Sequence, residues 1–354
     1  MCTVRFTGKV VPARPGGGLL VLALAAGLLA PACAARNYLE PVAPTARLDQ
    51  PPPGIPTPRS IRVVTFNIRH GKRVDEAIAA LKTHPELRDA DILLLQEMSG
   101  AGVEAMARAL SLEFAYYPAS NHQGRDNGNA VLSRWPILSS WKVPLPHVAR
   151  TTGEVRAAVG ARLLVGDRLF LAYSVHVSSP FALTPTQRND QVAAVLADAA
   201  ASAEPATIGG DFNGWRIGRQ LEGAGYAWVT RDVGPSLVSF SVDHIFTRGL
   251  PSSDGSPWAE APALGRLPGS PGAGTPGGRG AGARAGVARD VLGVSDHRPV
   301  WAVLSLGPCA PGPERSSRLR TWPGGRCEKL TIRDLTPCPD PLSPGRRPCP
   351  HAGS

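Results

Sequence analysis

The chain has 354 residues, a formal charge of +10 and a pI near 9.8. Its hydrophobic fraction of 43% is enough for a sizeable core, which argues against a chain that is disordered throughout. Residues 1–59 hold six Lys/Arg against two Asp/Glu, and residues 306–354 hold eight against four, so these flanks carry +8 of the charge. The basic balance is therefore weak evidence for a nucleic-acid partner.

The N-terminal 35 residues have the pattern of a secretory signal peptide. Three basic residues precede the uncharged Leu/Ala-rich run 19–30, and small residues follow it. The run is shorter than the roughly 20 apolar residues that an ordinary transmembrane helix needs. Cys33 leaves open a bacterial lipoprotein signal and membrane anchoring through an acyl chain, although Leu29 stands one residue further from it than that signal prefers.

Both flanks of the central region are expected to lack a fold. Residues 36–59 are rich in proline and have no periodicity, which predicts an extended linker. Residues 307–354 form a tail that contains proline and cysteine and is expected to be disordered. No cysteine lies between positions 34 and 308, so the fold does not depend on disulfides. Four tail cysteines could pair in three ways after export or remain thiols: Cys309, Cys327, Cys338 and Cys349.

The first half of the central region alternates predicted strands and helices. Apolar residues at positions 74, 77, 78 and 81, with Asp75 and Glu76 in the first turn, indicate an amphipathic helix on a sheet. Residues 102–110 show a second apolar stripe of this kind, which is expected to pack in the core. The expected elements are strand 63–66, helix 74–81, strand 92–95, helix 102–110 and, after a polar loop at 121–128 that would rim a cleft, strand 129–132.

The second half is expected to contain an adjacent strand pair, a capped helix and an insertion. Thr184, Pro185 and Gln187 supply an N-cap, a first-turn proline and a capping box. Residues 251–286 include a stretch of only Gly, Ala, Pro, Ser, Thr and Arg, which predicts a disordered insertion. The expected elements are strands 157–164 and 169–175 with a turn at 165–168, a helix from 185 to about 200, strand 206–208 and strand 300–304.

Polar clusters follow the apolar runs, and together they predict a chemical site. In the Gly-Gly-Asp-Phe-Asn segment 209–213, Asp211 and Asn213 lie on the same side of an extended chain. Such a segment alone is more often an ordinary turn, one isolated Glu after a strand is usually solvated, and one isolated His is usually a hydrogen-bonded filler. Here, however, strands would deliver several clusters to the same edge of a sheet: Asn67, Gln96-Glu97, His176, Asp243-His244 and Ser295-Asp296-His297.

These motifs resemble the endonuclease/exonuclease/phosphatase superfamily over residues 60–306. His244 departs from the pattern, since relatives more often have Tyr or Arg there. The resemblance implies a four-layer α/β sandwich in which two packed mixed β-sheets are flanked by helices. The matching segments are TFNIR at 65–69, LQE at 95–97, GNAVLSR at 128–134, SVH at 174–176, GDFN at 210–213, VDHIF at 242–246 and SDHRPV at 295–300.

The resemblance also implies roles for single residues. Mg²⁺, or Mn²⁺ in its place, would be bound by Glu97, and Asn67 and Asp296 would complete or orient that metal shell. Asp211 would activate water, and His297 oriented by Asp243 would act as a base or as a cation that stabilises the transition state. The remaining expected roles are phosphate donation by Asn213, phosphate donation or leaving-group protonation by His176, and phosphate binding by Arg156 and Asn129.

The expected function is that of an exported, metal-dependent phosphoesterase. It would hydrolyse phosphodiester bonds in nucleic acid or phospholipid head groups, act as a monomer, and be periplasmic, secreted or lipid-anchored. A non-catalytic module that binds nucleic acid or lipid head groups with the same fold is the alternative. Loss of catalysis normally removes a carboxylate or histidine, whereas this sequence has the full set.

The export signal makes a prediction about the mature protein. Removal of the signal leaves a chain that lacks about the first 30 residues, the length of such a segment. Mass spectrometry of the secreted and membrane fractions checks this, and a diacylglyceryl mass on Cys33 identifies the lipoprotein form. Mature cytoplasmic protein that retains Met1 would contradict export.

Overall fold

The structure is a computed structural model. Several predicted segments lie outside the residues that the structure describes: the signal peptide with Cys33, most of the linker, most of the insertion, and the four tail cysteines. The described residues are 36–40, 58–122, 124–250, 284–289, 291 and 293–307.

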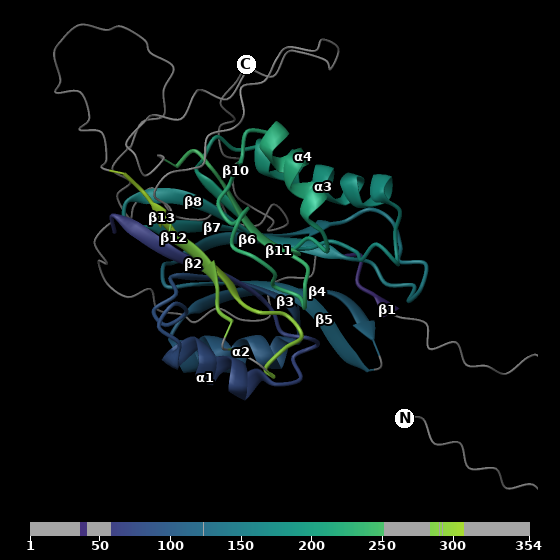
Figure 1. The fold of residues 1–354 in the computed structure, drawn as a ribbon, viewed down its shortest axis with the longest axis horizontal. Coiled ribbons are helices and arrows are strands. Elements are labelled where there is room, and N and C mark those ends of the chain that lie inside the picture. The colour runs from purple at the N-terminus through teal and green to yellow at the C-terminus, as the bar shows by residue number, and fades with distance from the viewer. Residues whose placement is uncertain are drawn as a thin grey trace, which may run out of the picture. The chain divides into compact units, whose positions relative to one another are not determined.

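Two mixed β-sheets form the centre of the described fold (Figure 1). The first has the strand order β1-β4-β5-β3-β2-β13-β12, in which only β2 and β3 pair in parallel. The bounds of its strands are β1 Arg36–Asn37, β2 Ser60–Asn67, β3 Ile92–Met98, β4 Glu113–His122, β5 Arg125–Ser133, β12 Arg284–Val287 and β13 Val300–Ser305.

The second sheet has the order β10-β11-β9-β8-β7-β6, in which only β8 and β9 are parallel. The turn predicted between two adjacent strands is confirmed, because β7 and β8 pair from Val165 and Arg168 onward. The bounds of its strands are β6 Ile137–Pro144, β7 Ala157–Val165, β8 Arg168–His176, β9 Ala206–Asp211, β10 Ala227–Trp228 and β11 Asp243–Arg248.

Helices cover the outer face of each sheet, which confirms the predicted four-layer sandwich. Figure 1 shows α1 (Val74–Thr83) and α2 (Gly100–Leu110) outside the first sheet, and α3 (Pro185–Ala200) and α4 (Gly218–Gly223) outside the second. A short 3₁₀ turn, Trp215–Ile217, precedes α4. The capping box of Thr184 and Gln187 is present at the start of α3. In the described residues, no helix is long and apolar enough to span a membrane.

The alternation of side chains along β2 shows how the layers form. Val64 packs in the core beneath α1 and α2, whereas Ile61 and Val63 pack in the core between the sheets. Because side chains in a strand alternate with period two, Thr65 and Asn67 continue the inter-sheet face. That face therefore changes from apolar to polar toward the end of the strand.

The facing strand β8 shows the same change. Phe170 and Ala172 belong to the inter-sheet core, and Ser174 and His176 follow on that face. Ser174 Oγ donates to the Leu95 carbonyl at 2.8 Å and accepts from Gln96 Nε2 at 3.0 Å. These bonds satisfy buried polar groups, so the two sheets remain packed where their shared face becomes polar.

Two glycines at the end of β9 allow the sheets and strands to approach closely. A Cβ on Gly209 would lie 2.6 Å from Leu94 Cδ1 of the opposite sheet. Gly210 has φ +154°, and a Cβ there would lie 1.9 Å from the Val175 carbonyl oxygen on the neighbouring strand. No other residue type fits at Gly210 without backbone movement, whereas at Gly209 the Leu94 side chain would have to move.

Three segments differ from the sequence predictions. Residues 36 and 37, expected in the linker, pair with β4 opposite Asn121 and Ser120. The end of the expected insertion, from Arg284, is β12 and pairs with β13. The expected loop at 121–128 is largely a hairpin, because the ladder between β4 and β5 extends to His122 and Arg125. In each case backbone pairing to another strand overrides local composition.

The glycine packing predicts a large difference between two Gly→Ala substitutions. Gly210→Ala should destabilise the fold by about 3 kcal/mol or more, because its Cβ would collide with the β8 backbone. Gly223→Ala in α4 is the matched control, since nothing lies within 4 Å of its Cβ position, and it should be neutral or slightly stabilising. Urea unfolding measures both, and equal midpoints would contradict the packing argument.

Candidate active site

Strand ends from both sheets bring the predicted site residues together. The sequence predicted that these residues meet at one edge of a single sheet, and this prediction is wrong. Asn67 and Glu97 belong to the first sheet, whereas His176, Asp211 and Asp243 belong to the second. Within the second sheet, Asp211 is the register partner of both His176 and Asp243. Three adjacent strands therefore place three functional side chains in one row.

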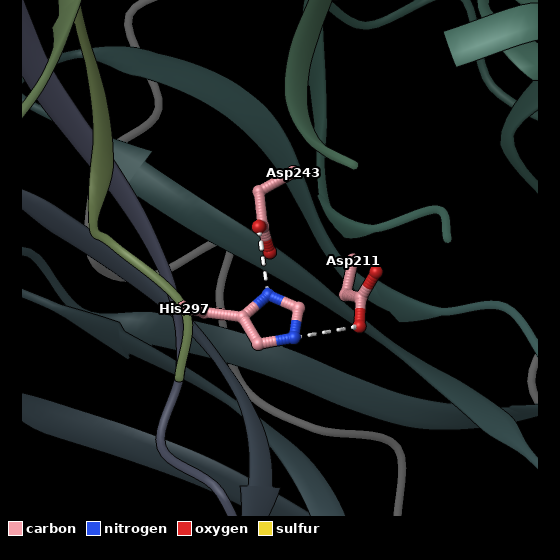
Figure 2. A group of neighbouring side chains, drawn as sticks. All are labelled: Asp211, Asp243 and His297. Carbon is pink, nitrogen blue, oxygen red and sulfur yellow. Dashed lines mark hydrogen bonds and ion pairs between the residues drawn. The ribbon is translucent and has the colours of Figure 1, made fainter. Parts of the chain in front are cut away.

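His297 lies between two buried carboxylates (Figure 2). Its Nδ1 is 2.8 Å from Asp243 Oδ2, and its Nε2 is 3.7 Å from Asp211 Oδ2. The segment before β13 supplies this histidine, and the Leu237 backbone bridges to it. Ser236 Oγ accepts from the Asp243 N–H at 3.1 Å, so the carboxylate that orients the imidazole is itself held by its backbone.

The surroundings of His297 favour the imidazolium. Burial alone would lower the pKa of His297, but the negative charges of Asp243 and Asp211 outweigh it and raise the pKa to about 10. The ring is therefore charged at neutral pH, with Nδ1–H donated to Asp243. In this state it can donate a proton or stabilise negative charge.

Asp211 is a carboxylate whose ionisation lies near neutrality. Burial, followed by repulsion from Asp243, raises the pKa of Asp211 to about 7, while His297 acts in the opposite direction. Asn67 Nδ2 donates to Asp211 Oδ2 at 3.1 Å, and the Asn213 N–H donates to Oδ1 at 2.8 Å. A carboxylate with such a pKa and fixed orientation is suited to removing a proton from water.

His176 is a neutral imidazole directed at the same carboxylate. Burial, followed by the charge of Arg156, holds the pKa of His176 well below its usual value. Arg156 NH1 lies 3.4 Å from Nδ1, which favours the tautomer with the proton on Nε2. That nitrogen is 3.4 Å from Asp211 Oδ2 and 3.9 Å from Glu97 Oε1. His176 therefore lies between a carboxylate of the second sheet and one of the first.

Glu97 enters the site through an irregularity in β3. The register of β3 shifts between Leu95 and Met98, and Glu97 has φ +56°, an uncommon conformation for a non-glycine residue. Its Oε2 accepts the His70 backbone N–H at 3.1 Å and lies 3.4 Å from His70 Nε2. Backbone strain of this kind occurs where surrounding contacts fix a side chain for function.

Asp296 lies at the rim of the site and is the most exposed of the predicted ligands. It pairs with Arg69 Nε at 3.4 Å and accepts from Ser295 Oγ at 3.2 Å. Ser295 Oγ also lies 2.7 Å from the Asn67 carbonyl, so it links this acid to the end of β2. Asn67 Oδ1 accepts the Arg69 N–H at 3.0 Å. The metal roles of Asn67, Glu97 and Asp296 remain predictions.

A different buried group has the spacing of a metal site. The ligand atoms of Asp211, Asp243 and His297 all lie within 4.8 Å of one another, so this group could hold a cation. Asp243 Oδ1 is buried without a hydrogen-bond partner among the described residues, which fits an unused ligand oxygen. A protonated His297 offers no lone pair, so ligation by all three requires its deprotonation.

Two asparagines expected at phosphate use their amide protons within the protein. Asn213 Nδ2 donates to the Val177 carbonyl at 2.9 Å and lies 3.3 Å from Asp211 Oδ2. Asn129 Nδ2 donates to the Ala157 and Ser174 carbonyls at 2.8 and 3.2 Å and so ties the sheets together. Both side chains therefore hold the backbone around the site in place, and their contact with phosphate remains a prediction.

Arg188 and His70 are supporting residues that the sequence did not single out. Arg188 NH2, from α3, donates to the Phe212 and Asn213 carbonyls at 2.9 Å each, which fixes the turn after Asp211. His70 contacts Glu97 as described. A helix arginine and a loop histidine are too common in sequences to signal such contacts. His244 points to the outer face of its strand, against Trp228, where burial lowers its pKa to about 4.

Comparisons with known proteins agree with this fold and assign the family. The model of the Endonuclease/Exonuclease/phosphatase family matches residues 64–297. Escherichia coli YbhP is 29% identical over 219 residues, which cover 53% of this chain and 76% of YbhP. The crystal structure of an endonuclease/exonuclease/phosphatase from Beutenbergia cavernae superposes with a TM-score of 0.50 at 19% identity, over 71% of this chain and 72% of that one. The crystal structure of an endonuclease/exonuclease/phosphatase from Bacteroides vulgatus has a TM-score of 0.50 at 16% identity, over 70% of this chain and 99% of that one.

The buried pair of Asp243 and His297 predicts a pH dependence of stability. Because folding raises the pKa of His297 from 6.5 to about 10, the stabilisation is full below pH 6.5 and is lost as the pH rises toward 10. Asp243→Asn should flatten this loss by about 1.4 kcal/mol for each unit by which it lowers that pKa.

Urea unfolding at about pH 6.5 and 10, the limits set by these pKa values, measures the slope. Asp190→Asn is the matched control, because it removes an exposed partner of His147 at the same 2.8 Å distance. An exposed pair contributes little, so this control should keep the wild-type slope. Equal slopes for all three proteins would contradict the charge assignment.

Proposed function

This chain belongs to the endonuclease/exonuclease/phosphatase family, and on that premise we propose that it is a metal-dependent phosphoesterase that hydrolyses phosphodiester bonds. The observation that carries the proposal is one buried constellation: Asp211, with a pKa near 7, beside the imidazolium of His297, which Asp243 holds. Hydrolysis of a phosphodiester requires an activated water and donors for developing negative charge. These residues supply both functions.

Asp211 activates the attacking water in this proposal. Its Oδ2 accepts from Asn67 and its Oδ1 from the Asn213 backbone, so the carboxylate has a fixed direction. With a pKa near 7 it is partly ionised at neutral pH and remains basic enough to take a proton. The oxygen of the water then attacks phosphorus while its proton moves to Asp211, and the bond from phosphorus to the leaving oxygen breaks, so that negative charge passes to that oxygen.

His297 and His176 stabilise the negative charge that develops on the phosphoryl and leaving oxygens. The Nε2–H of the His297 imidazolium points toward Asp211 and is available to a substrate oxygen. His176 is neutral, with its Nε2–H directed to the same place and Arg156 behind it. Fixed donors in a buried site stabilise a transition state without reorganisation, which supports this division of roles.

Glu97 is the residue proposed to hold Mg²⁺ or Mn²⁺, with Asn67 and Asp296 completing or orienting the shell. Hard carboxylate and amide oxygens suit Mg²⁺, and the strained backbone of Glu97 holds its carboxylate next to His176 and Asp211. When bound, the cation neutralises substrate oxygens and lowers the pKa of coordinated water.

We further propose that the chain is exported, because residues 1–35 have the pattern of a signal peptide, and that its substrate is nucleic acid or phospholipid. The rival function, binding without catalysis, would need no water-activating acid. The complete acid and histidine set therefore favours an enzyme.

Three variants test the catalytic roles. Asp211→Asn and His297→Ala should each reduce turnover about a thousandfold or more, because neither water activation nor a transition-state donor is replaced by added ions. Glu97→Gln should chiefly shift activity to higher Mg²⁺ concentration, since excess cation partly restores binding. Turnover of bis-p-nitrophenyl phosphate measured against Mg²⁺ concentration checks all three.

Asp190→Asn, the exposed-pair variant, should retain wild-type turnover and serves as the control. Near-full activity of His297→Ala, or equal wild-type activity in EDTA, would contradict the assignment. A folded wild-type chain without turnover on any nucleic-acid or phospholipid substrate would favour the binding module.

A further inference from the structure

The exposed large apolar side chains of the described residues all lie on one side of the fold. They are Leu39 (64% exposed), Val148 (52%), Phe181 (88%), Val238 (73%) and Phe240 (65%), and we call them the apolar rim. Single exposed apolar residues are ordinary, but a one-sided distribution is not. The strand registers place every member at the edge where the candidate active site lies.

Phe181 and Val148 lie on one side of Asp211. Phe181 follows β8, whose last residue is His176. Val148 lies in the connection from β6 to β7, which reaches β7 at a level close to His176. The two loops are joined by a hydrogen bond from the Arg150 N–H to the Ala182 carbonyl at 3.2 Å.

Val238 and Phe240 lie on the other side. They precede β11, which begins at Asp243, and the Leu237 backbone between Ser236 and Val238 bridges to His297. Since β11, β9 and β8 are adjacent in the sheet, Asp211 on β9 lies between the two apolar groups. The polar site is therefore flanked by apolar side chains on both sides.

Leu39 extends the rim to the edge of the first sheet. The Tyr38 N–H donates to the Ala119 carbonyl, beside the end of β4, so Leu39 lies at the level where β3 ends near Met98.

The turn that carries Val238 is held in an unfavourable conformation. Val238 has φ +47°, which is a rare value for a β-branched residue. Leu237 and Phe240 exchange backbone hydrogen bonds of 2.9 and 2.7 Å, and Arg298 NH1 donates to the Val238 carbonyl at 3.4 Å. These contacts hold the strained turn and keep both apolar side chains in solvent, which is costly without a partner.

We propose that the apolar rim inserts into the surface of a phospholipid bilayer and places the site over lipid phosphodiesters. This names the substrate class of the proposed phosphoesterase and rests on that function. Separate apolar side chains around a polar centre suit a fluid interface, and the exposed Arg150, on the loop that carries Val148, suits anionic head groups. A nucleic acid needs a continuous cationic track, whereas residues 60–305 carry a net charge of only about +2.

Co-sedimentation with vesicles of phosphatidylcholine and phosphatidylglycerol tests the rim. All proteins are the mature chain with Cys33→Ser, so that no acyl chain contributes, and EDTA prevents turnover. Phe181→Ala and Phe240→Ala should each weaken vesicle partitioning about tenfold, which corresponds to loss of most of one buried phenyl group. Ala105→Phe is the matched control: it adds an exposed phenyl on α2 in the outer helix layer and should leave partitioning unchanged.

Absence of wild-type sedimentation would overturn the proposal, as would equal partitioning of the wild type and both rim variants. If the rim variants instead lost binding to single-stranded DNA while vesicle binding was unchanged, the occupant would be nucleic acid and the bilayer proposal would be wrong. Because partitioning is measured without hydrolysis, failure of the rim and failure of the phosphoesterase assignment give different results.

Discussion

The structure depends on the contact face between its two sheets, which is apolar along most of its length and polar at one end. Apolar side chains such as Val63 and Phe170 hold the sheets together by burial. At the polar end the same packing would be unfavourable unless each buried group had a partner, and Gln96, Ser174 and Asn129 supply hydrogen bonds across the gap. The active-site residues are the continuation of this polar layer to the strand ends.

Electrostatics at that end follow from burial and charge balance. Asp211 and Asp243 are buried on neighbouring strands, so both cannot easily be ionised without a cation between them. His297 provides that charge, which raises its own pKa, while repulsion and burial raise the pKa of Asp211. One arrangement therefore gives an acid and a base suited to opposite tasks near neutral pH.

The same strand ends also decide what surrounds the chemistry. Val148, Phe181, Val238 and Phe240 of the apolar rim lie in loops that enter or leave the second sheet beside His176 and Asp243. Exposed apolar side chains therefore lie on both sides of Asp211. The fold thus places the candidate active site and these exposed apolar side chains on one side of the molecule.

The sequence alone determined the element types, the capping box of α3, and the identities of the residues that meet at the site, because periodicity, capping chemistry and strand-end motifs are local. It did not determine that two sheets contribute those residues, that β1 pairs with the distant β4, that residues 284–287 form β12 beside β13, or that His70 and Arg188 support Glu97 and Asp211. It also gave no sign that Phe181 and Phe240 would be exposed beside the same site. These features depend on contacts between segments far apart in the chain, and only the tertiary packing brings such segments together.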